Sequence, residues 1–327
     1  MGPQVYVTRM LPQPALDRMK EAGFQFEVYP EDRAIPREVL LEKIKNRDGA
    51  LCILTDAIDR DVFEQANKIR IFANYAVGYN NIDIGEATRR GIAVTNTPGV
   101  LTDATTDLAW ALLFAAARRI VESDADLRQG KFDGWGPMRF LGQDVTGAVL
   151  GVVGMGRIGK AFAARAAAFQ MKILYVSRKP EPEFEAAYAP SARRVELDEL
   201  LRRSDFVSLH VPLSPETTHL IGERELRLMQ PHAILVNTAR GPIVDEGALV
   251  KALEEKWIWA AALDVYEQEP KVHPGLIGLS NAVLCPHIGS ATFRTRTRMG
   301  LMAVENLIAF FSGKRPPNLV NSEIWKK

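Results

Sequence analysis

Three residues that could carry out chemistry follow apolar, strand-like segments of the chain. Arg240 follows "AILVN", Glu269 follows "AAALDV", and His287 follows "AVLCP". The carboxyl ends of parallel strands form the ligand-binding edge of an open α/β sheet, so we expect these side chains to lie together. An arginine pairs with a carboxylate and polarises a carbonyl oxygen, a histidine gives that oxygen a proton, and a nearby glutamate stabilises the protonated histidine. The set predicts hydride transfer to the keto carbon of a 2-keto acid.

A hydride donor site is predicted from "GVVGMGRIGKAF", which begins at Gly151. An apolar strand leads into a G-x-G-x-x-G turn, and an alanine-rich helix leads out of it, which is the context that a dinucleotide turn requires. Gly154 allows the tight turn, Gly156 lets backbone N–H groups approach a pyrophosphate, and Gly159 permits close packing of the helix on the strand.

The strand after this turn ends in Ser177, Arg178 and Lys179. A carboxylate at about 20 residues from the glycines would bind the ribose hydroxyls of NAD, whereas a hydroxyl and two cations suit a 2′-phosphate. We therefore expect NADP(H) to be preferred, with NAD(H) possible. The alternative is that Arg178 and Lys179 are solvated loop charges.

These residues require a scaffold of parallel strands, and the chain alternates β-rich and helical segments throughout. "NTPGVLTDATTD" interrupts the alternation and separates two such blocks. The fold class predicted is α/β, with two doubly wound parallel-sheet lobes: a Rossmann cofactor domain inserted into a flavodoxin-like substrate domain. We expect the substrate (catalytic) domain at residues 1–100 and 290–327, and the NAD(P)-binding Rossmann domain at residues 101–289.

Four segments together resemble the D-isomer-specific 2-hydroxyacid dehydrogenase family: "VVGMGRIGKAFA", "NTARGPIVDEGALVKAL", "AALDVYEQEP" and "PHIGSAT". The resemblance covers essentially the whole chain and is strongest to the glyoxylate/hydroxypyruvate reductase branch. It implies that Arg240, Glu269 and His287 are catalytic. It also implies that the backbone of Val77 and Gly78 binds the substrate carboxylate, together with Arg240 and His287. Further cofactor contacts are implied at Met155, Arg157, Ile158, Thr238, Ala239, Asp264, Ile288 and Gly289, with Asp264 facing the nicotinamide amide.

The function expected is that of an NADPH-preferring reductase of glyoxylate and hydroxypyruvate, which gives glycolate or D-glycerate with His287 as general acid/base. One alternative is another D-2-hydroxyacid dehydrogenase, acting on phosphoglycerate, D-lactate or a bulkier 2-keto acid. Another is a dinucleotide-sensing protein scaffold. Glu269 argues against the related formate dehydrogenases, which pair their histidine with glutamine. No catalytic role is expected for His210.

Composition excludes several partners. The 327 residues carry a net charge of +1, so no overall field attracts nucleic acid. The longest apolar run, residues 108–117, is shorter than the roughly 20 residues of a membrane span and predicts a buried helix. The sequence shows no signal segment and no spacing of metal ligands. We expect Cys52 and Cys285 to be free thiols in a reducing cytoplasm. We expect a cytoplasmic homodimer without a metal, in which Trp135 either anchors its own domain or reaches the partner's active site.

Overall fold

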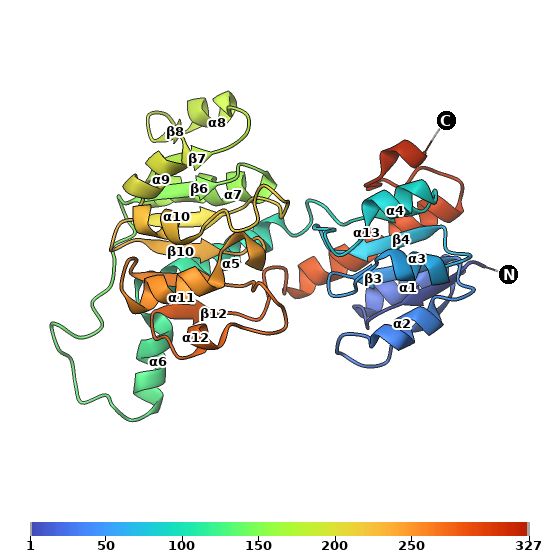
Figure 1. Ribbon diagram of the computed structural model, residues 1–327, viewed down its shortest axis with the longest axis horizontal. Helices are drawn as coiled ribbons and strands as arrows, with labels where there is room; N and C mark the ends of the chain where they lie inside the picture. Colours follow the sequence, from blue (N-terminus) through green and yellow to red (C-terminus); the bar gives the residue numbers. More distant parts are fainter. Residues whose placement is uncertain (1, 326–327) are drawn as a thin grey trace. The chain divides into compact units, whose positions relative to one another are not determined.

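The computed structural model describes residues 2–325, and the chain divides into two compact units. One unit, which we call the N/C unit, comprises Met1–Leu101 and Ser290–Lys327. The other, the inserted unit, comprises Thr102–Gly289. Each is an α/β unit built on its own parallel sheet, which confirms the predicted fold class (Figure 1).

The N/C unit has a five-stranded sheet in the order β2-β1-β3-β4-β5. This is the flavodoxin-like order of doubly wound sheets. Its strands are β1 (Gln4–Val7), β2 (Gln25–Val28), β3 (Gly49–Ile53), β4 (Ile71–Tyr75) and β5 (Ala93–Thr95). Its helices are α1 (Gln13–Glu21), α2 (Arg37–Lys43), α3 (Arg60–Gln65), α4 (Ile84–Arg89), α13 (Phe293–Phe311) and the 3-10 turn Ser322–Ile324.

Helix α13 brings the end of the chain back onto the sheet formed by the first hundred residues. It packs against α1 and β4, and Met299, Val304 and Leu307 are buried there. Gly300 permits the close approach, because a Cβ at that position would lie 2.7 Å from the Cβ of Ala15. Helices α2 to α4 cover the opposite face of the sheet.

The inserted unit has a seven-stranded sheet in the order β12-β11-β10-β9-β6-β7-β8, all parallel. Its first six strands in sequence have the Rossmann order. The strands are β6 (Val149–Val153), β7 (Lys172–Val176), β8 (Ala192–Arg194), β9 (Phe206–Leu209), β10 (Ile234–Asn237), β11 (Ala260–Leu263) and β12 (Ala282–Leu284). The helices are α5 (Thr102–Ala117), α6 (Ile120–Arg128), α7 (Arg157–Ala166), α8 (Pro182–Ala187), α9 (Leu197–Arg203), α10 (Glu223–Leu228), α11 (Glu246–Glu254) and α12 (Pro274–Ile277), with 3-10 turns at Ala167–Phe169 and Gly241–Ile243.

The apolar run at residues 108–117 lies in α5, which together with α7 covers one face of this sheet. The Trp110 and Phe162 rings stack with centroids 4.7 Å apart, and the indole N–H of Trp110 donates to the carbonyl of Phe162 at 3.2 Å. Helices α9 to α12 cover the other face. None of the helices in residues 2–325 is long and apolar enough to cross a membrane.

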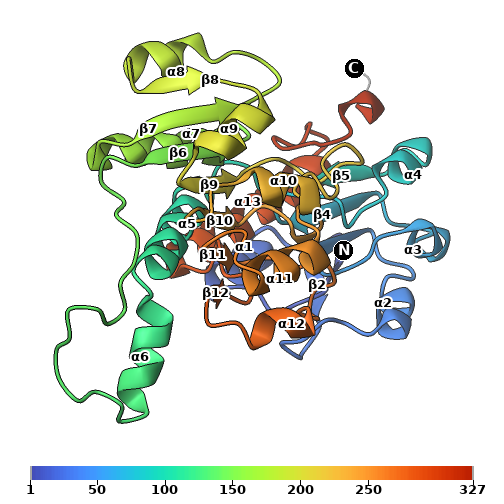
Figure 2. The same cartoon turned by 60° about the vertical axis from the view of Figure 1, so that its left-hand side comes forward.

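Two features of the inserted unit were not predicted. Strand β8 has only three residues, which is too short for a hydrophobic alternation to be visible. Helix α6 was missed because none of its residues is buried. Figures 1 and 2 both show α6 and the loop after it extending away from the body of the inserted unit. We call residues 120–147 the arm.

Candidate active site and cofactor site

The glycine-rich turn connects β6 to α7 and is shaped by close backbone contacts. Gly154 has φ +102°, and a Cβ there would lie 2.8 Å from the carbonyl carbon of His210. A Cβ at Gly159 would lie 1.9 Å from the carbonyl oxygen of Gly154, so this glycine lets the helix pack on the turn. A Cβ at Gly156 would meet nothing within 4 Å, so the turn is open on that side.

The open side of the turn is the start of α7. Gly156 is the N-cap residue of this ten-residue helix, and no side chain caps its N–H groups. Uncapped N–H groups at a helix N-terminus bind phosphate oxygens well. The residues present therefore fit the pyrophosphate of a dinucleotide.

Ser177, Arg178 and Lys179 follow β7 at the same edge of the sheet. The Ser177 hydroxyl donates to the carbonyl of Lys179 at 2.5 Å and so closes the local turn. The sequence had led us to expect that this hydroxyl would point outward, toward a phosphate. Arg194 of β8 stands beside them, and its Nε donates to the carbonyl of Ser177 at 3.1 Å. Sequence reasoning missed Arg194 because only the pairing of β8 with β7 brings it to this corner.

The cations at this corner differ from their neighbours in their pairing. Lys160 forms an ion pair with Glu181, and Arg193 forms one with Glu199. Among the described residues, by contrast, no ion pair is formed by Arg178, Lys179 or Arg194. A hydrogen bond with Ser214 is the main cause that lowers the pKa of Glu216, and the nearby positive charge of Arg178 contributes to the same shift.

His287 and Glu269 form a hydrogen-bonded pair at the ends of β12 and β11. His287 Nδ1 lies 2.8 Å from Glu269 Oε2, and the two side chains are 26% and 24% exposed. The other carboxylate oxygen of Glu269 accepts from the N–H of Tyr266 at 3.1 Å. Tyr266 in turn donates its hydroxyl to the carbonyl of Cys285 at 2.9 Å. The tyrosine thus ties the loop after β11 to the segment that carries His287.

Electrostatics keep Glu269 ionised. Burial acts to raise the pKa of Glu269, but the hydrogen bond and charge of His287, the Tyr266 N–H and the charge of Arg240 outweigh it, so the pKa lies below its usual value. The pair therefore places an ionised carboxylate against one ring nitrogen of His287.

Arg240 follows β10, and the side chain of Asn237 holds the backbone of this segment in place. The Asn237 side chain donates to the carbonyl of Arg240 at 2.9 Å and accepts from the N–H of Ala239 at 3.0 Å. Gly241 allows this segment to touch the loop after β11, because a Cβ there would lie 1.8 Å from the carbonyl carbon of Tyr266. Burial lowers the pKa of the guanidinium, and the charge of Glu269 opposes that effect.

Asp264 follows β11 and is almost fully buried. One of its carboxylate oxygens accepts from the N–H of Ile288 and the other from the N–H of Gly289, both at 2.7 Å. His287, directly before these residues, has φ +55°, a left-handed conformation that is uncommon for residues other than glycine. Asp264 thus holds the turn that fixes this conformation of His287.

Two further residues have buried polar atoms near this edge. The Thr238 hydroxyl oxygen is buried and has no hydrogen-bond partner among the described residues. His210 lies against the Phe162 ring, and burial lowers its pKa to about 3, so it stays neutral. Its Nε2 is 2.9 Å from the Ser208 hydroxyl. His210 is thus a half-buried, neutral histidine that packs on Phe162.

Val77 and Gly78 lie in the N/C unit, in the turn that follows β4. Neither N–H group donates a hydrogen bond to another residue within the described part of the chain. They are thus available as donors for an anion.

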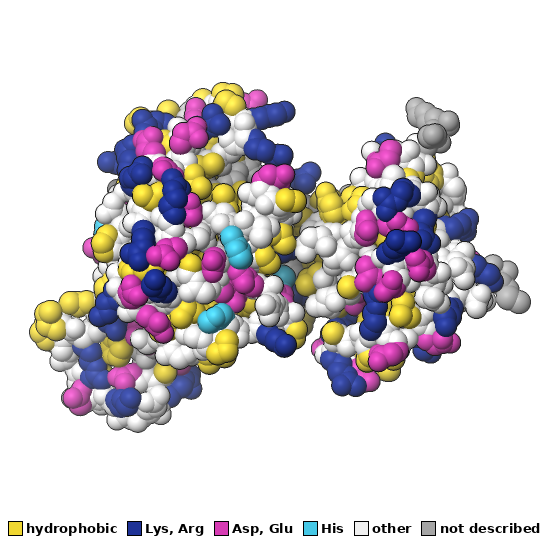
Figure 3. Space-filling model, viewed as in Figure 1, with side chains coloured by type: hydrophobic (Ala, Val, Ile, Leu, Met, Phe, Trp, Pro, Cys, Tyr) yellow, Lys and Arg dark blue, Asp and Glu magenta, His cyan; other side chains and the backbone are white. Residues whose placement is uncertain are grey.

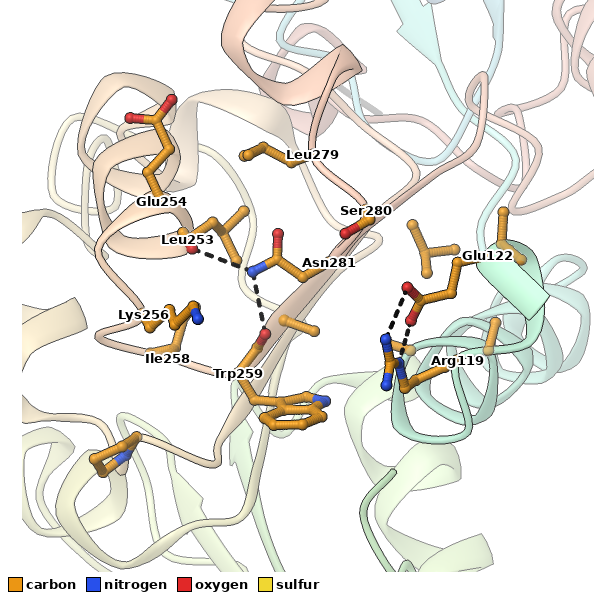
Figure 4. Close-up of a pocket in the computed structure, with 16 residues that line it drawn as sticks. Arg119, Glu122, Leu253, Glu254, Lys256, Ile258, Trp259, Leu279, Ser280 and Asn281 are labelled. Atoms are coloured by element: carbon orange, nitrogen blue, oxygen red, sulfur yellow. Dashed lines mark hydrogen bonds and ion pairs between the residues drawn. The ribbon is translucent and has the colours of Figure 1, made fainter. Parts of the chain in front are cut away.

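A separate pocket of about 410 Å³ lies between the end of α5, the start of α6 and the segments that lead into β11 and β12 (Figure 4). Arg119 and Glu122 form an ion pair on one side of it, and Asn281 donates to the backbone of Leu253 and Trp259 on the other. None of its lining residues belongs to the predicted catalytic or cofactor set.

Comparison with known proteins identifies the family of this chain. Residues 110–289 match the family described as "D-isomer specific 2-hydroxyacid dehydrogenase, NAD binding domain". The glyoxylate reductase of Thermococcus gammatolerans is 53% identical over 330 aligned positions, which cover 100% of this chain and 98% of that protein.

Solved structures resemble the chain over almost all of its length. The TT0316 protein of Thermus thermophilus has a TM-score of 0.91 and 46% identity, with 97% of this chain and 99% of that chain covered. The NADPH-dependent glyoxylate/hydroxypyruvate reductase of Sinorhizobium meliloti, solved with NADP and malonate, has a TM-score of 0.85 and 30% identity, with 100% and 99% covered. The chain therefore belongs to the D-isomer specific 2-hydroxyacid dehydrogenase family, in its glyoxylate reductase branch, and is an NAD(P)-dependent oxidoreductase.

Proposed function

We propose that the protein is an NADPH-preferring reductase of small 2-keto acids, acting on glyoxylate and hydroxypyruvate to give glycolate or D-glycerate. The observation that carries this proposal is the hydrogen-bonded pair His287–Glu269 at the ends of two neighbouring strands of a dinucleotide-binding sheet. The dinucleotide supplies the hydride when it is bound.

His287 is the general acid/base of this reaction. Its Nδ1 is engaged by Glu269, which leaves Nε2 to exchange a proton with the substrate oxygen. Arg240 polarises that oxygen and pairs with the carboxylate of the substrate, which the N–H groups of Val77 and Gly78 also bind. The carboxylate of Glu269 stabilises the charge that His287 carries before it gives up its proton.

The preference for NADPH rests on the corner after β7. Arg178, Lys179 and Arg194 are cations without an ion-pair partner in the described residues, and a 2′-phosphate provides the opposite charge. Four further residues would contact the nicotinamide half of the bound dinucleotide: Thr238, Asp264, Ile288 and Gly289. The unpartnered hydroxyl of Thr238 supports it.

The direct test is the oxidation of NADPH and NADH on addition of glyoxylate or hydroxypyruvate, each at saturating keto acid. Turnover with a higher kcat/KM for NADPH is the expected result. Equal use of both cofactors would contradict the cofactor preference alone. Tight binding of NADPH without turnover of any 2-keto acid would contradict the reaction.

We also propose that the protein is a homodimer that buries the arm. Large apolar side chains are exposed along the arm, including Trp135 (87% exposed) and Met138 (78% exposed). Figure 3 shows hydrophobic side chains gathered on the left side of this region. Exposed apolar surface of this kind marks an interaction site on a protein, and a second copy of the chain is the partner that we propose.

A further inference from the structure

The segment that follows β4 has its carbonyl groups tied to the segment that follows β5. The carbonyl of Ala76 accepts from the N–H of Thr97 at 2.8 Å, and the carbonyl of Val77 accepts from the side-chain amide of Asn96 at 2.8 Å. On the far side of the turn, the Asn74 side chain donates to the carbonyl of Gly78 at 3.0 Å.

These bonds decide where the neighbouring N–H groups point. In a planar trans peptide, the carbonyl of one residue and the N–H of the next point in opposite directions. Because the carbonyls of Ala76 and Val77 both face the adjacent residues Asn96 and Thr97, the N–H groups of Val77 and Gly78 both face away from them. Two consecutive N–H groups directed to one side form a concave donor site for an anion.

Asn96 is itself held firmly by the elements behind it. Its carbonyl accepts from the Asn306 side chain of α13 at 3.3 Å, and its N–H donates to the carbonyl of Asn318 at 3.2 Å. Asn306 is fully buried, and its side-chain oxygen Oδ1 accepts from the N–H of Asn318. These contacts involve the backbone of Asn96. Within residues 2–325, the one hydrogen bond of its side chain is to the carbonyl of Val77.

We propose that Asn96 is a positioning residue for substrate binding: its side-chain amide fixes the Val77–Gly78 peptide so that the N–H of Gly78 faces the carboxylate of a 2-keto acid. This inference rests on the proposed function. Asn96 does not touch the substrate. It acts by holding a neutral backbone donor in place, so the interaction that it supports is with the carboxylate and not with the reacting carbon.

The test is the variant Asn96→Ala, compared with Asn321→Ala. Asn321 is the control, because its side chain also hydrogen-bonds to backbone groups of the N/C unit. It accepts from the N–H of Val94 and donates to the carbonyl of Ile92. We would measure the dissociation constant of oxalate, a two-carbon carboxylate, for the NADPH-saturated protein by titration calorimetry. Steady-state kinetics with glyoxylate and thermal melting complete the comparison.

In Asn96→Ala the N–H of Gly78 would no longer be held toward the charged carboxylate. We therefore expect the oxalate dissociation constant and the glyoxylate KM to rise about tenfold. The turnover number should change by no more than about twofold, because ground state and transition state lose the same contact. Asn321→Ala should lower the melting temperature and leave oxalate binding unchanged. If Asn96→Ala does not fold, Asn96→Ser takes its place.

Unchanged oxalate binding in a folded Asn96 variant, with glyoxylate turnover intact in the original protein, would overturn this inference alone. Equal weakening of oxalate binding in both variants would also overturn it, because the effect would then be general destabilisation. Failure of the original protein to bind oxalate or to reduce glyoxylate would overturn the proposed function as well.

Discussion

His287 Nδ1 lies 2.8 Å from Glu269 Oε2, although 18 positions of sequence separate the two residues. The segment after β11 fixes both partners: Glu269 accepts from the N–H of Tyr266, whose hydroxyl donates to the carbonyl of Cys285 just before His287. Asp264 binds the two N–H groups that follow His287. The geometry of the pair is therefore set before any substrate binds, which would lower the cost of reorganisation in the proton transfer that we propose.

The variant Glu269→Gln should lower kcat/KM for glyoxylate by about 100-fold, because positioned acid–base groups contribute at least that much. Glutamine keeps the shape of the side chain but cannot stabilise a protonated His287 by charge. NADPH binding should stay within about twofold, measured by fluorescence titration, because the expected contacts with the dinucleotide lie elsewhere. Glu254→Gln, on the exposed side of α11, serves as control. Full activity in Glu269→Gln would rule out the role of the carboxylate.

The same carboxylate makes stability depend on pH. Its pKa is lower in the folded chain than its usual value of 4.5, so it stabilises the fold at pH above 4.5. That contribution is lost as the pH falls through the folded-state pKa. Urea denaturation should therefore show a difference in unfolding free energy between the original protein and Glu269→Gln that shrinks as the solution is acidified below pH 4.5. A difference that grows on acidification would contradict this sign.

Gly241→Ala should damage the site through its backbone. The new Cβ would lie 1.8 Å from the carbonyl carbon of Tyr266, so the segments that carry Arg240 and Glu269 must move apart. Overpacking of this kind costs about 1–3 kcal/mol, so we expect a lower melting temperature and a large loss of glyoxylate reduction. Gly278→Ala is the matched control, because a Cβ there meets nothing within 4 Å. Equal effects of the two substitutions would contradict the role of the Gly241 contact.

The fold could be predicted because strong apolar strands alternate with helices, and this pattern fixes parallel βαβ units. The pairing of Glu269 with His287 could be expected for the same reason, since both follow predicted strands. The contacts of Asn96 and Arg194 could not be predicted, because they depend on strand pairing and backbone orientation between distant segments. These contacts leave no periodic signal in the chain.

Ser177 illustrates the same limit at the cofactor corner. Its place after β7 was evident from the sequence, but the direction of its hydroxyl depends on how the next two residues turn. The arm was missed for a different reason: helix α6 buries none of its residues, so it has no core-facing stripe. Its apolar side chains are exposed in the isolated chain, and we propose that a second copy covers them.

The double variant Arg178→Ala/Lys179→Ala should lower kcat/KM for NADPH by at least about tenfold, since each charge-assisted contact with a phosphate is worth roughly 1.5–3 kcal/mol before solvent screening. The value for NADH should change by less than about twofold, because NADH carries no 2′-phosphate. Arg193→Ala is the control, because Arg193 lies on β8 but is paired with Glu199. A parallel loss with both cofactors would show that the two cations stabilise the turn instead of selecting the phosphate.

Trp135→Glu should convert the protein from dimer to monomer at micromolar concentration. The indole is 87% exposed in the single chain, so it does not anchor its own unit, and burial against a second copy would be worth roughly 2–3 kcal/mol on each side of a two-fold interface. A buried carboxylate at the same place would cost more than the lost contact.

Light scattering coupled to size exclusion measures the mass directly. Phe293→Glu is the control, because Phe293 is 99% exposed but lies on α13, outside the arm. A dimer that persists in Trp135→Glu would place the interface elsewhere, and an original protein that is monomeric at the same concentration would exclude the homodimer. If Trp135→Glu is a stable monomer that still reduces glyoxylate with a changed KM, the arm contributes to the partner's substrate pocket as well as to assembly.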